Sequence, residues 1–146
     1  MENNKKSLEV FELLTSMKKI FGLLRDFHSL QAQNNLEAAI LTFIKFHQGV
    51  DQAKIVDILK VPKQTVSYTI CKLEKEGSIE SKFCKNDKRR KTLNLTKKGQ
   101  IYAEESLKPL MDLHKEIYDE MGEEKIISMK KDVKELTRLI EEKTRR

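Results

Sequence analysis

The fold of this chain is decided by residues 54–77, KIVDILKVPKQTVSYTICKLEKEG. The apolar residues before Pro62 recur at helical spacing and predict a short helix, for which Asp51 is a suitable N-cap. Pro62 interrupts that pattern because its ring fixes φ and removes a backbone donor, yet proline is tolerated where a helix begins. A second helix is therefore predicted over residues 63–76, with Gly77 as the residue that follows its C-terminus. The stretch predicts two helices joined by a tight turn.

The second predicted helix has two chemically different sides. At about 100° per residue, Val66, Ile70 and Leu73 fall in one narrow sector, which suits packing on the preceding helix. The opposite side is polar or basic, and such a side can enter a groove of DNA. The candidate DNA contacts on this helix are Lys63, Gln64, Thr65, Ser67, Tyr68 and Lys72.

Several of these candidates have a second interpretation. Gln64 and Ser67 can hydrogen-bond to base edges. Tyr68 can contact a thymine methyl group or a phosphate, but an aromatic residue can equally pack between domains. Lys72 suits a phosphate, or it serves surface solubility beside the acidic Glu76.

The hydrophobic pattern changes its period after Gly77. Ser78–Cys84 and Thr92–Leu95 alternate apolar and polar residues, which predicts two strands. The basic segment Lys85–Lys91 is expected to be a long charged connector between them. Thr96 is well placed to cap a following helix. Two helices followed by a hairpin are the order of a winged helix-turn-helix.

Helices are also predicted on both sides of this central part. Residues 7–32 form one long amphipathic helix, and a second helix starts near Leu36 and ends before Gly49. Residues 97–120 and 123–144 form two more. The last of these has apolar residues at spacings of three and four, the a/d pattern of a helix that packs along a partner helix, at Ile126, Met129, Val133, Leu136 and Ile140. The predicted fold class is mostly α with a small β-hairpin wing.

Charge is distributed unevenly along the chain. The 146 residues carry 29 Lys or Arg and 23 Asp or Glu, a formal net charge of +6. Residues 60–98 hold twelve of the basic and four of the acidic residues, so this part sums to +8 and the remainder to −2. A polyphosphate backbone requires such localised positive charge, although a basic run is often only a solvated surface.

Other functional classes have little support in the sequence. No apolar stretch is long enough to span a bilayer, and the N-terminus lacks the apolar segment of a secretory signal, so we expect a cytoplasmic protein. The motifs of the common nucleotide-binding and hydrolytic enzymes are absent, which predicts no enzymatic activity and no cofactor. His28, His47 and His114 lie far apart, so no metal site is expected. Cys71 falls on the polar side of the second helix, where its oxidation would block DNA binding, but a small tolerated residue is the simpler interpretation.

Three segments resemble those of the MarR family of bacterial transcription regulators. Residues 54–77 resemble the helix-turn-helix of that family, Asn86–Arg90 its D-x-R wing signature, and Leu95–Gly99 the L-T-x-x-G that follows the wing. The resemblance covers residues 36–105 closely, and the flanking helices match only in layout. Pro62 departs from the commoner pattern, because many relatives have a serine there that caps the helix.

The resemblance implies roles for the wing and for the outer helices. Asp87 would brace the wing and Arg89 would contact DNA, whereas without the resemblance the two could be a loop ion pair of little consequence. The outer helices, residues 1–34 and 99–146, would form an obligate homodimer around a DNA-binding lobe of residues 35–98. The candidate DNA contacts of the wing are Lys85, Asn86, Asp87, Lys88, Arg89, Arg90 and Lys91.

The sequence thus predicts a homodimeric, sequence-specific regulator that binds double-stranded DNA. Its two recognition helices would enter successive major grooves of a pseudo-palindromic operator. Repression modulated by a small-molecule effector is the usual mode in the family. The alternative is a winged-helix protein-interaction module that has lost DNA binding.

Overall fold

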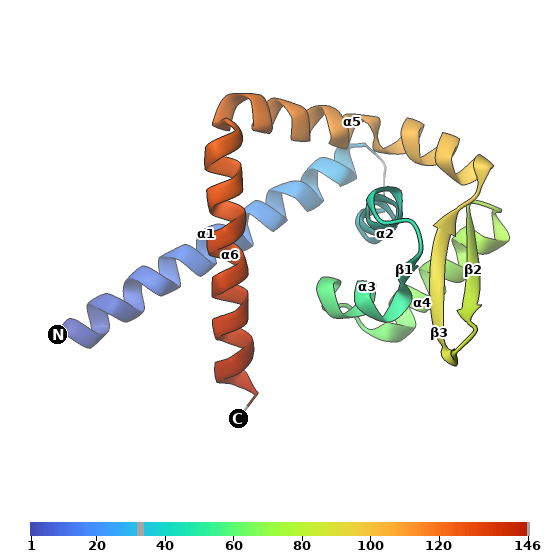
Figure 1. Cartoon of the computed structure of the whole chain (residues 1–146). Coiled ribbons are helices and arrows are strands. Elements are labelled where there is room, and N and C mark those ends of the chain that lie inside the picture. Colours follow the sequence, from blue (N-terminus) through green and yellow to red (C-terminus); the bar gives the residue numbers. More distant parts are fainter. Residues whose placement is uncertain (32–33, 146) are drawn as a thin grey trace. The chain divides into compact units, whose positions relative to one another are not determined.

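The computed structural model describes residues 1–31 and 34–145, which form helices and one small sheet (Figure 1). The chain divides into two compact units, Met1–Leu107 and Lys108–Arg146. In the described residues, no helix has the length and apolar character needed to cross a membrane. The elements are α1 (Glu2–Leu30), α2 (Asn35–Phe46), β1 (Val50–Asp51), α3 (Gln52–Leu59), α4 (Lys63–Lys75), β2 (Ile79–Cys84), β3 (Asp87–Leu95), α5 (Lys97–Met121) and α6 (Glu123–Thr144).

The mostly helical winged-helix fold predicted from the sequence is confirmed, and the largest difference in a helix boundary is at the start of α1. The helix α1 begins five residues before the predicted residue 7, at Glu2. Glu2 lies in the first turn, where a carboxylate is favoured, and its Oε1 lies 2.8 Å from Lys6 Nζ, which supports the extra turn. The predicted end of this helix, residue 32, lies outside the described residues.

The core of the first unit forms where α2, α3, α4 and the sheet meet. Val66, Ile70 and Leu73 of α4 are at most 1% exposed, as the predicted apolar side requires. They lie in a core with buried aliphatic residues of the neighbouring elements, among which Ile40, Leu41, Ile44, Ile55 and Leu93 are at most 1% exposed. Burying the apolar side of α4 leaves its other side in solvent.

Local capping sets the ends of the two central helices. Asp51 Oδ1 accepts a hydrogen bond from Ala53 N at 2.9 Å, so the predicted cap of α3 is confirmed. Pro62 precedes α4 without a side-chain cap. At the other end of α4, Gly77 has a φ of 75° and its N–H donates to Glu74 O at 3.0 Å. The N–H of Ser78 donates to Leu73 O at 2.9 Å, which completes a Schellman motif and turns the chain into β2.

The sheet differs from the predicted two-stranded hairpin in two ways. It has three antiparallel strands in the order β1-β3-β2, because Val50 and Asp51 pair with Leu93 and Thr92. A strand of two residues has no periodicity that a sequence pattern could detect.

The long connector predicted over Lys85–Lys91 is wrong. The strand β3 already begins at Asp87, which pairs with Cys84, so most of the basic segment belongs to the strand. Strand pairing satisfies backbone groups whatever the side chain, and this end of the ribbon is exposed enough to solvate the basic residues. A register shift lies between Phe83 and Cys84.

The junction between the sheet and α5 explains the signature Leu95–Gly99. Thr96 Oγ1 accepts a hydrogen bond from Gly99 N at 3.0 Å, which confirms its predicted capping role, and it donates to Gly77 O at 2.5 Å. Thr96 N also donates to Ser78 O at 3.1 Å. Gly99 packs so closely on Ser78 that a Cβ built on it would lie 1.8 Å from the Ser78 carbonyl oxygen. Only glycine fits this position without a backbone shift.

The second unit consists of the end of α5 and of α6. The boundary between the units lies beside Pro109, which interrupts the hydrogen bonding inside α5 because it has no N–H. Gly122, with a φ of 85°, ends α5 at the predicted position. None of the α6 residues that the structure describes is buried, so the predicted a/d stripe lies open in the isolated chain.

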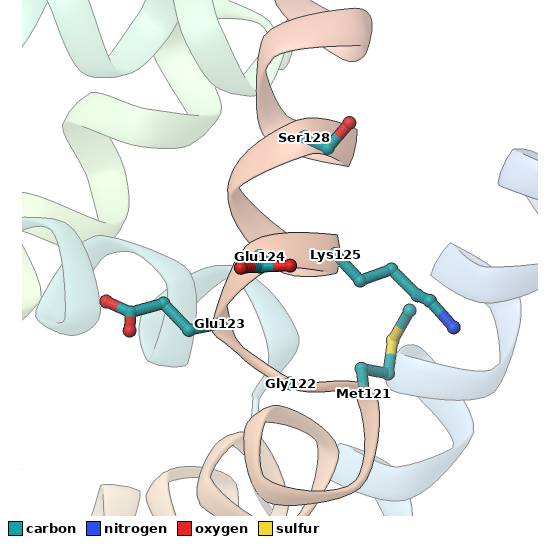
Figure 2. A pocket seen from close by; sticks show the side chains of 6 residues that line it. All are labelled: Met121, Gly122, Glu123, Glu124, Lys125 and Ser128. Carbon is teal, nitrogen blue, oxygen red and sulfur yellow. The ribbon is translucent and has the colours of Figure 1, made fainter.

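An open hollow of about 600 Å³ lies at the turn between α5 and α6. Figure 2 shows that the side chains of Glu123 and Lys125 point to opposite sides of this turn. Glu123 and Glu124 lie in the first turn of α6, where their charges complement the positive end of the helix dipole. These two acidic residues make the turn a poor site for an anion.

Candidate nucleic-acid interface

The polar side of α4 is exposed as the sequence predicts. Lys63, Gln64 and Thr65 lie exposed in its first turn. Tyr68 is 75% exposed, so its ring does not pack in the core of the chain. Ser67 is half-buried, and its Oγ accepts a hydrogen bond from Gln52 Nε2 at 3.0 Å. This side therefore offers an ammonium group, an amide and hydroxyls at successive positions, which are the groups that bind phosphates and base edges.

Lys72 is the one α4 candidate whose charge is already engaged within the described residues. Its Nζ lies 3.1 Å from Glu37 Oε2 on α2, and its side chain is half-exposed. The hydrogen bond that Lys72 donates to Glu37 raises the pKa of Lys72. The sequence interpretation paired Lys72 with the nearby Glu76, but the direct partner lies 35 residues away.

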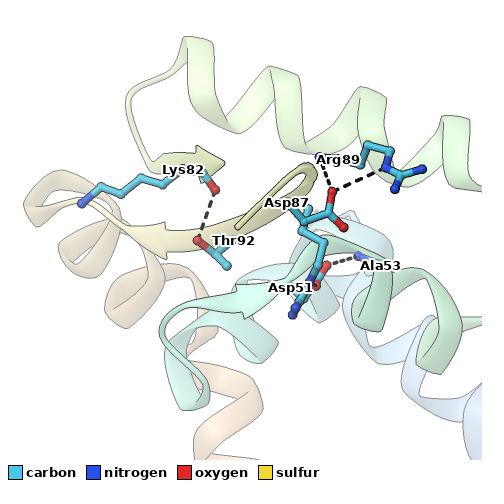
Figure 3. Close-up of polar contacts among 7 residues, drawn as sticks. Asp51, Ala53, Lys82, Asp87, Arg89 and Thr92 are labelled. Atoms are coloured by element: carbon cyan, nitrogen blue, oxygen red, sulfur yellow. Dashed lines mark hydrogen bonds and ion pairs between the residues drawn. The ribbon is translucent and has the colours of Figure 1, made fainter. Parts of the chain in front are cut away.

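The turn of the wing is built around Asp87. Its Oδ1 accepts a hydrogen bond from Arg89 N at 2.9 Å, and Arg89 Nε lies 3.5 Å from the same oxygen (Figure 3). The Arg89 side chain is 93% exposed, so the contact with Asp87 leaves the guanidinium open to a ligand. Lys85, Asn86 and Lys88 are exposed around it.

Two long-range ion pairs hold the root of the wing against the helices. Arg90 Nε donates to Asp51 Oδ2 at 2.7 Å, and Lys91 Nζ lies 3.5 Å from Glu74 Oε1 on α4. Glu74 also accepts a hydrogen bond from Ser81 Oγ of β2. The sequence predicted Asp51 only as a helix cap and did not single out Glu74. No local pattern reveals partners 39 and 17 residues apart, since each pair forms only when the sheet folds onto the helices.

A cavity of about 310 Å³ lies between the wing and the start of α3 and α4. Phe83, Arg89, Arg90 and Lys91 line it from the sheet. Gln52, Ala53, Val56 and Lys63 line it from the helices, and Asp51 lines it from the end of β1. The wing and the first turn of α4 therefore present their cations around one hollow, whose field favours an anion.

The ion pair between Asp51 and Arg90, which holds the wing against the helices, is sensitive to acid. The hydrogen bonds from Arg90 and from Ala53 N lower the pKa of Asp51 below its usual value of about 4. The ionised carboxylate therefore stabilises the fold above that usual value, and this contribution is lost as the pH falls through the lowered one.

We expect Asp51→Asn to be less stable than the wild type at pH 7, because asparagine keeps a capping oxygen but cannot pair ionically with Arg90. The difference should shrink as the pH is lowered toward 2. Urea unfolding of both proteins from pH 7 to pH 2 measures it. A difference that stays constant over this range would contradict a role for the ionised carboxylate.

The structure brings the predicted site residues together on two neighbouring surfaces. The α4 candidates lie on one exposed helix face, and Lys85, Asn86, Asp87, Lys88, Arg89, Arg90 and Lys91 lie in the wing that is anchored to α3 and α4. Lys91 is half-buried against Glu74, so its charge is partly compensated. Cys71 is exposed on the same helix face, whereas Cys84 is half-buried.

Comparison with known proteins identifies the same architecture. The sequence model of the MarR family matches residues 30–90. A search of curated proteins found no match.

Solved structures share the fold at low sequence identity. The chain is similar to NMB1585, a MarR family regulator from Neisseria meningitidis, with 23% identity, a TM-score of 0.80, and coverage of 92% of this chain and 95% of that one. It is also similar to MepR from S. aureus in its DNA-binding conformation, with 21% identity, a TM-score of 0.71, and coverage of 85% and 98%. NadR in complex with 4-hydroxyphenylacetate matches with 20% identity, a TM-score of 0.71, and coverage of 86% and 89%.

Sequence, fold and one local contact agree in their similarity to the MarR family. The family model covers the helix-turn-helix and the start of the wing, and the fold matches across most of the chain. The signature at Leu95–Gly99 has a structural reason in the contact between Gly99 and Ser78. Residues 30–90 of the chain are therefore similar to the MarR family, and the chain shares the winged-helix fold of solved MarR-family regulators.

Proposed function

We propose that the chain is a homodimeric regulator that binds double-stranded DNA at a specific, pseudo-palindromic site and represses transcription. The observation that supports this most is the exposed face of α4 beside an anchored basic wing. In this proposal Gln64, Thr65, Ser67 and Tyr68 read the major groove. Lys63 and the basic residues of the wing bind phosphates, with Arg89 at the exposed tip.

In this proposal the predicted domains have separate roles in DNA binding and in dimerisation. Residues 35–98 bind DNA, and residues 1–34 and 99–146 join two copies. The exposed apolar residues of α1 support this, because Val10, Phe11, Leu14 and Phe21 are all at least 40% exposed in the single chain. In α6, Met129, Val133 and Ile140 are also at least 40% exposed. Apolar surface of this extent on long helices is typical of an interface between protein chains.

A small-molecule effector is the further part of the proposal. NadR binds 4-hydroxyphenylacetate in its crystal structure, which supports an aromatic acid as the first class of compound to test. The expected result is that such a compound weakens binding of the protein to its operator. No change with a panel of aromatic acids would contradict this class.

DNA binding is tested by measuring affinity for mixed-sequence duplex DNA as a function of salt, followed by selection of a preferred site. We expect log affinity to fall linearly with log salt, with a slope that corresponds to several phosphates, and a two-fold symmetric selected site. Absence of binding at low salt would favour a winged-helix module that recognises a protein.

The variant Arg89→Ala tests the wing in the same assay. We expect it to weaken binding about 10- to 100-fold, because Arg89 is exposed and is already oriented by Asp87. Lys18→Ala, an exposed change of equal charge on α1, is the control and should leave affinity unchanged. If Arg89→Ala bound DNA with the affinity of the wild type, the tip of the wing would not contact DNA.

A further inference from the structure

A buried carboxylate joins three helices of the first unit. Glu37, in the first turn of α2, is 7% exposed. Its Oε1 accepts a hydrogen bond from Tyr102 OH of α5 at 2.8 Å, and its Oε2 pairs with Lys72 Nζ of α4 at 3.1 Å. Both oxygens are thereby engaged by partners 65 and 35 residues away in the sequence.

The backbone at Glu37 is also fixed by hydrogen bonds, because Glu37 lies in the capped first turn of α2. Asn34 Oδ1 accepts hydrogen bonds from Leu36 N at 3.0 Å and Glu37 N at 3.1 Å, which caps α2 directly at the cluster. The hydrogen bond to Glu37, together with partial burial, raises the pKa of Tyr102 to about 12, so this hydroxyl remains a donor at neutral pH. Glu37 therefore has a defined position between α4 and α5.

A carboxylate at this place is not required to hold the core together. Apolar residues of similar size often replace buried ion pairs without loss of stability, whereas a polar cluster accepts only one arrangement of its partners. The apolar side of α4 packs on aliphatic residues, and such contacts are not directional, so by themselves they leave small rotations of the helix open. Glu37 removes that freedom, because it must meet Lys72 and Tyr102 at the same time.

The ion pair with Glu37 also limits how well the ammonium group of Lys72 can bind a phosphate. Lys72 lies on α4 among candidate DNA contacts, yet its ammonium group is paired with Glu37 and sits in the field of Glu76 as well. Lys63, at the start of the same helix, is exposed and has no ion pair among the described residues. The charge of Lys63 is therefore free to bind a phosphate, whereas the charge of Lys72 is already paired with a carboxylate.

We propose that Glu37 is a positioning residue of the DNA interface, which sets the orientation of α4 through Lys72 and Tyr102 and withdraws the charge of Lys72 from the phosphates. The inference rests on the proposed DNA binding. It assigns Lys72 to selectivity between DNA sequences rather than to general affinity.

The test uses the full chain and measures two quantities for each variant. The first is the slope of log affinity against log salt on mixed-sequence DNA. The second is the ratio of affinities for the selected site and for mixed-sequence DNA. The variants are Glu37→Gln, Lys72→Gln and the double variant, with Lys63→Gln as the matched control on α4. Thermal denaturation of each variant establishes that it is folded.

Glu37→Gln should release Lys72, so the salt slope should steepen by about 0.9 while the selectivity ratio falls about tenfold. Lys72→Gln should lower the selectivity ratio and leave the slope unchanged. The double variant should return the slope to that of the wild type and keep the lower selectivity. Lys63→Gln should make the slope shallower by about 0.9.

Two results would overturn the inference while DNA binding stands. One is a Glu37→Gln variant with the slope and selectivity of the wild type. The other is a Lys72→Gln variant whose slope becomes shallower by about 0.9, as for a lysine that contacts phosphate; this variant leaves Glu37 in place and covers the case in which Glu37→Gln does not fold. A wild-type protein that does not bind DNA would instead refute the proposed function, and the inference with it.

Discussion

Replacing Gly99 by alanine is expected to lower the free energy of unfolding by about 3 kcal/mol or more. The added Cβ would lie 1.8 Å from Ser78 O and 2.7 Å from Ser78 C. Both atoms belong to the backbone, so no side-chain rotation can relieve the clash. The start of α5 or the turn after α4 must move, and the hydrogen bonds of Thr96 to Gly77 and Gly99 are lost with it.

The measurement is urea and thermal unfolding of Gly99→Ala. For a chain of this length, a loss of that size corresponds to a fall in Tm of roughly 10 °C. Gly22→Ala is the matched control, because the nearest atom that its Cβ would meet is Arg25 Nη2 at 3.8 Å, at the end of a flexible side chain. Gly22 lies inside α1, where alanine is favoured by about 1 kcal/mol, so the control should be as stable as the wild type or more stable. Equal stability of the two variants would contradict the close contact of Gly99 with Ser78.

Replacing Val133 by glutamate is expected to convert the proposed homodimer into a monomer. Val133 lies in the middle of the a/d stripe of α6 and is 40% exposed in the single chain. A carboxylate there is tolerated by the isolated helix, but in a dimer it would be buried without a partner, at a cost of several kcal/mol. A monomer can engage only one half of a two-fold operator, so DNA affinity should fall about 100-fold or more.

Sedimentation velocity at micromolar concentration measures the first effect, and the DNA-binding assay measures the second. Lys131→Gln is the control, because it changes the net charge by the same amount on the opposite side of α6. It should remain dimeric. A Val133→Glu variant with the sedimentation coefficient of the wild-type dimer would place the interface elsewhere, and a monomeric wild type would refute the dimer itself.

The local features of the winged helix-turn-helix could be predicted from the sequence. Pro62 and Gly77 mark the limits of α4, because backbone conformation at these residues depends on their own chemistry. The apolar side of α4 followed from the positions of Val66, Ile70 and Leu73, since a period of 3.6 residues is a property of the helix itself. Thr96 and Asp51 were identified as caps for the same reason: a cap forms with residues two or three positions away.

Features formed by distant segments needed the tertiary structure. The strand β1 forms only because Leu93 and Thr92 present backbone partners to Val50 and Asp51, which lie about 40 residues earlier. The pairing of Arg90 with Asp51 depends on how the sheet folds onto the helices, and charge patterns alone give a long-range ion pair no register.

Lys72 illustrates the same difference between local and long-range features. By itself the sequence determined that Lys72 lies on the polar side of a helix that we predict to contact DNA. Only the tertiary structure decided that Glu37 holds its charge, because the first turn of α2 meets α4 after both helices have packed. Local periodicity thus decides which face of a helix is polar, and long-range packing decides which polar groups on that face are still free to bind.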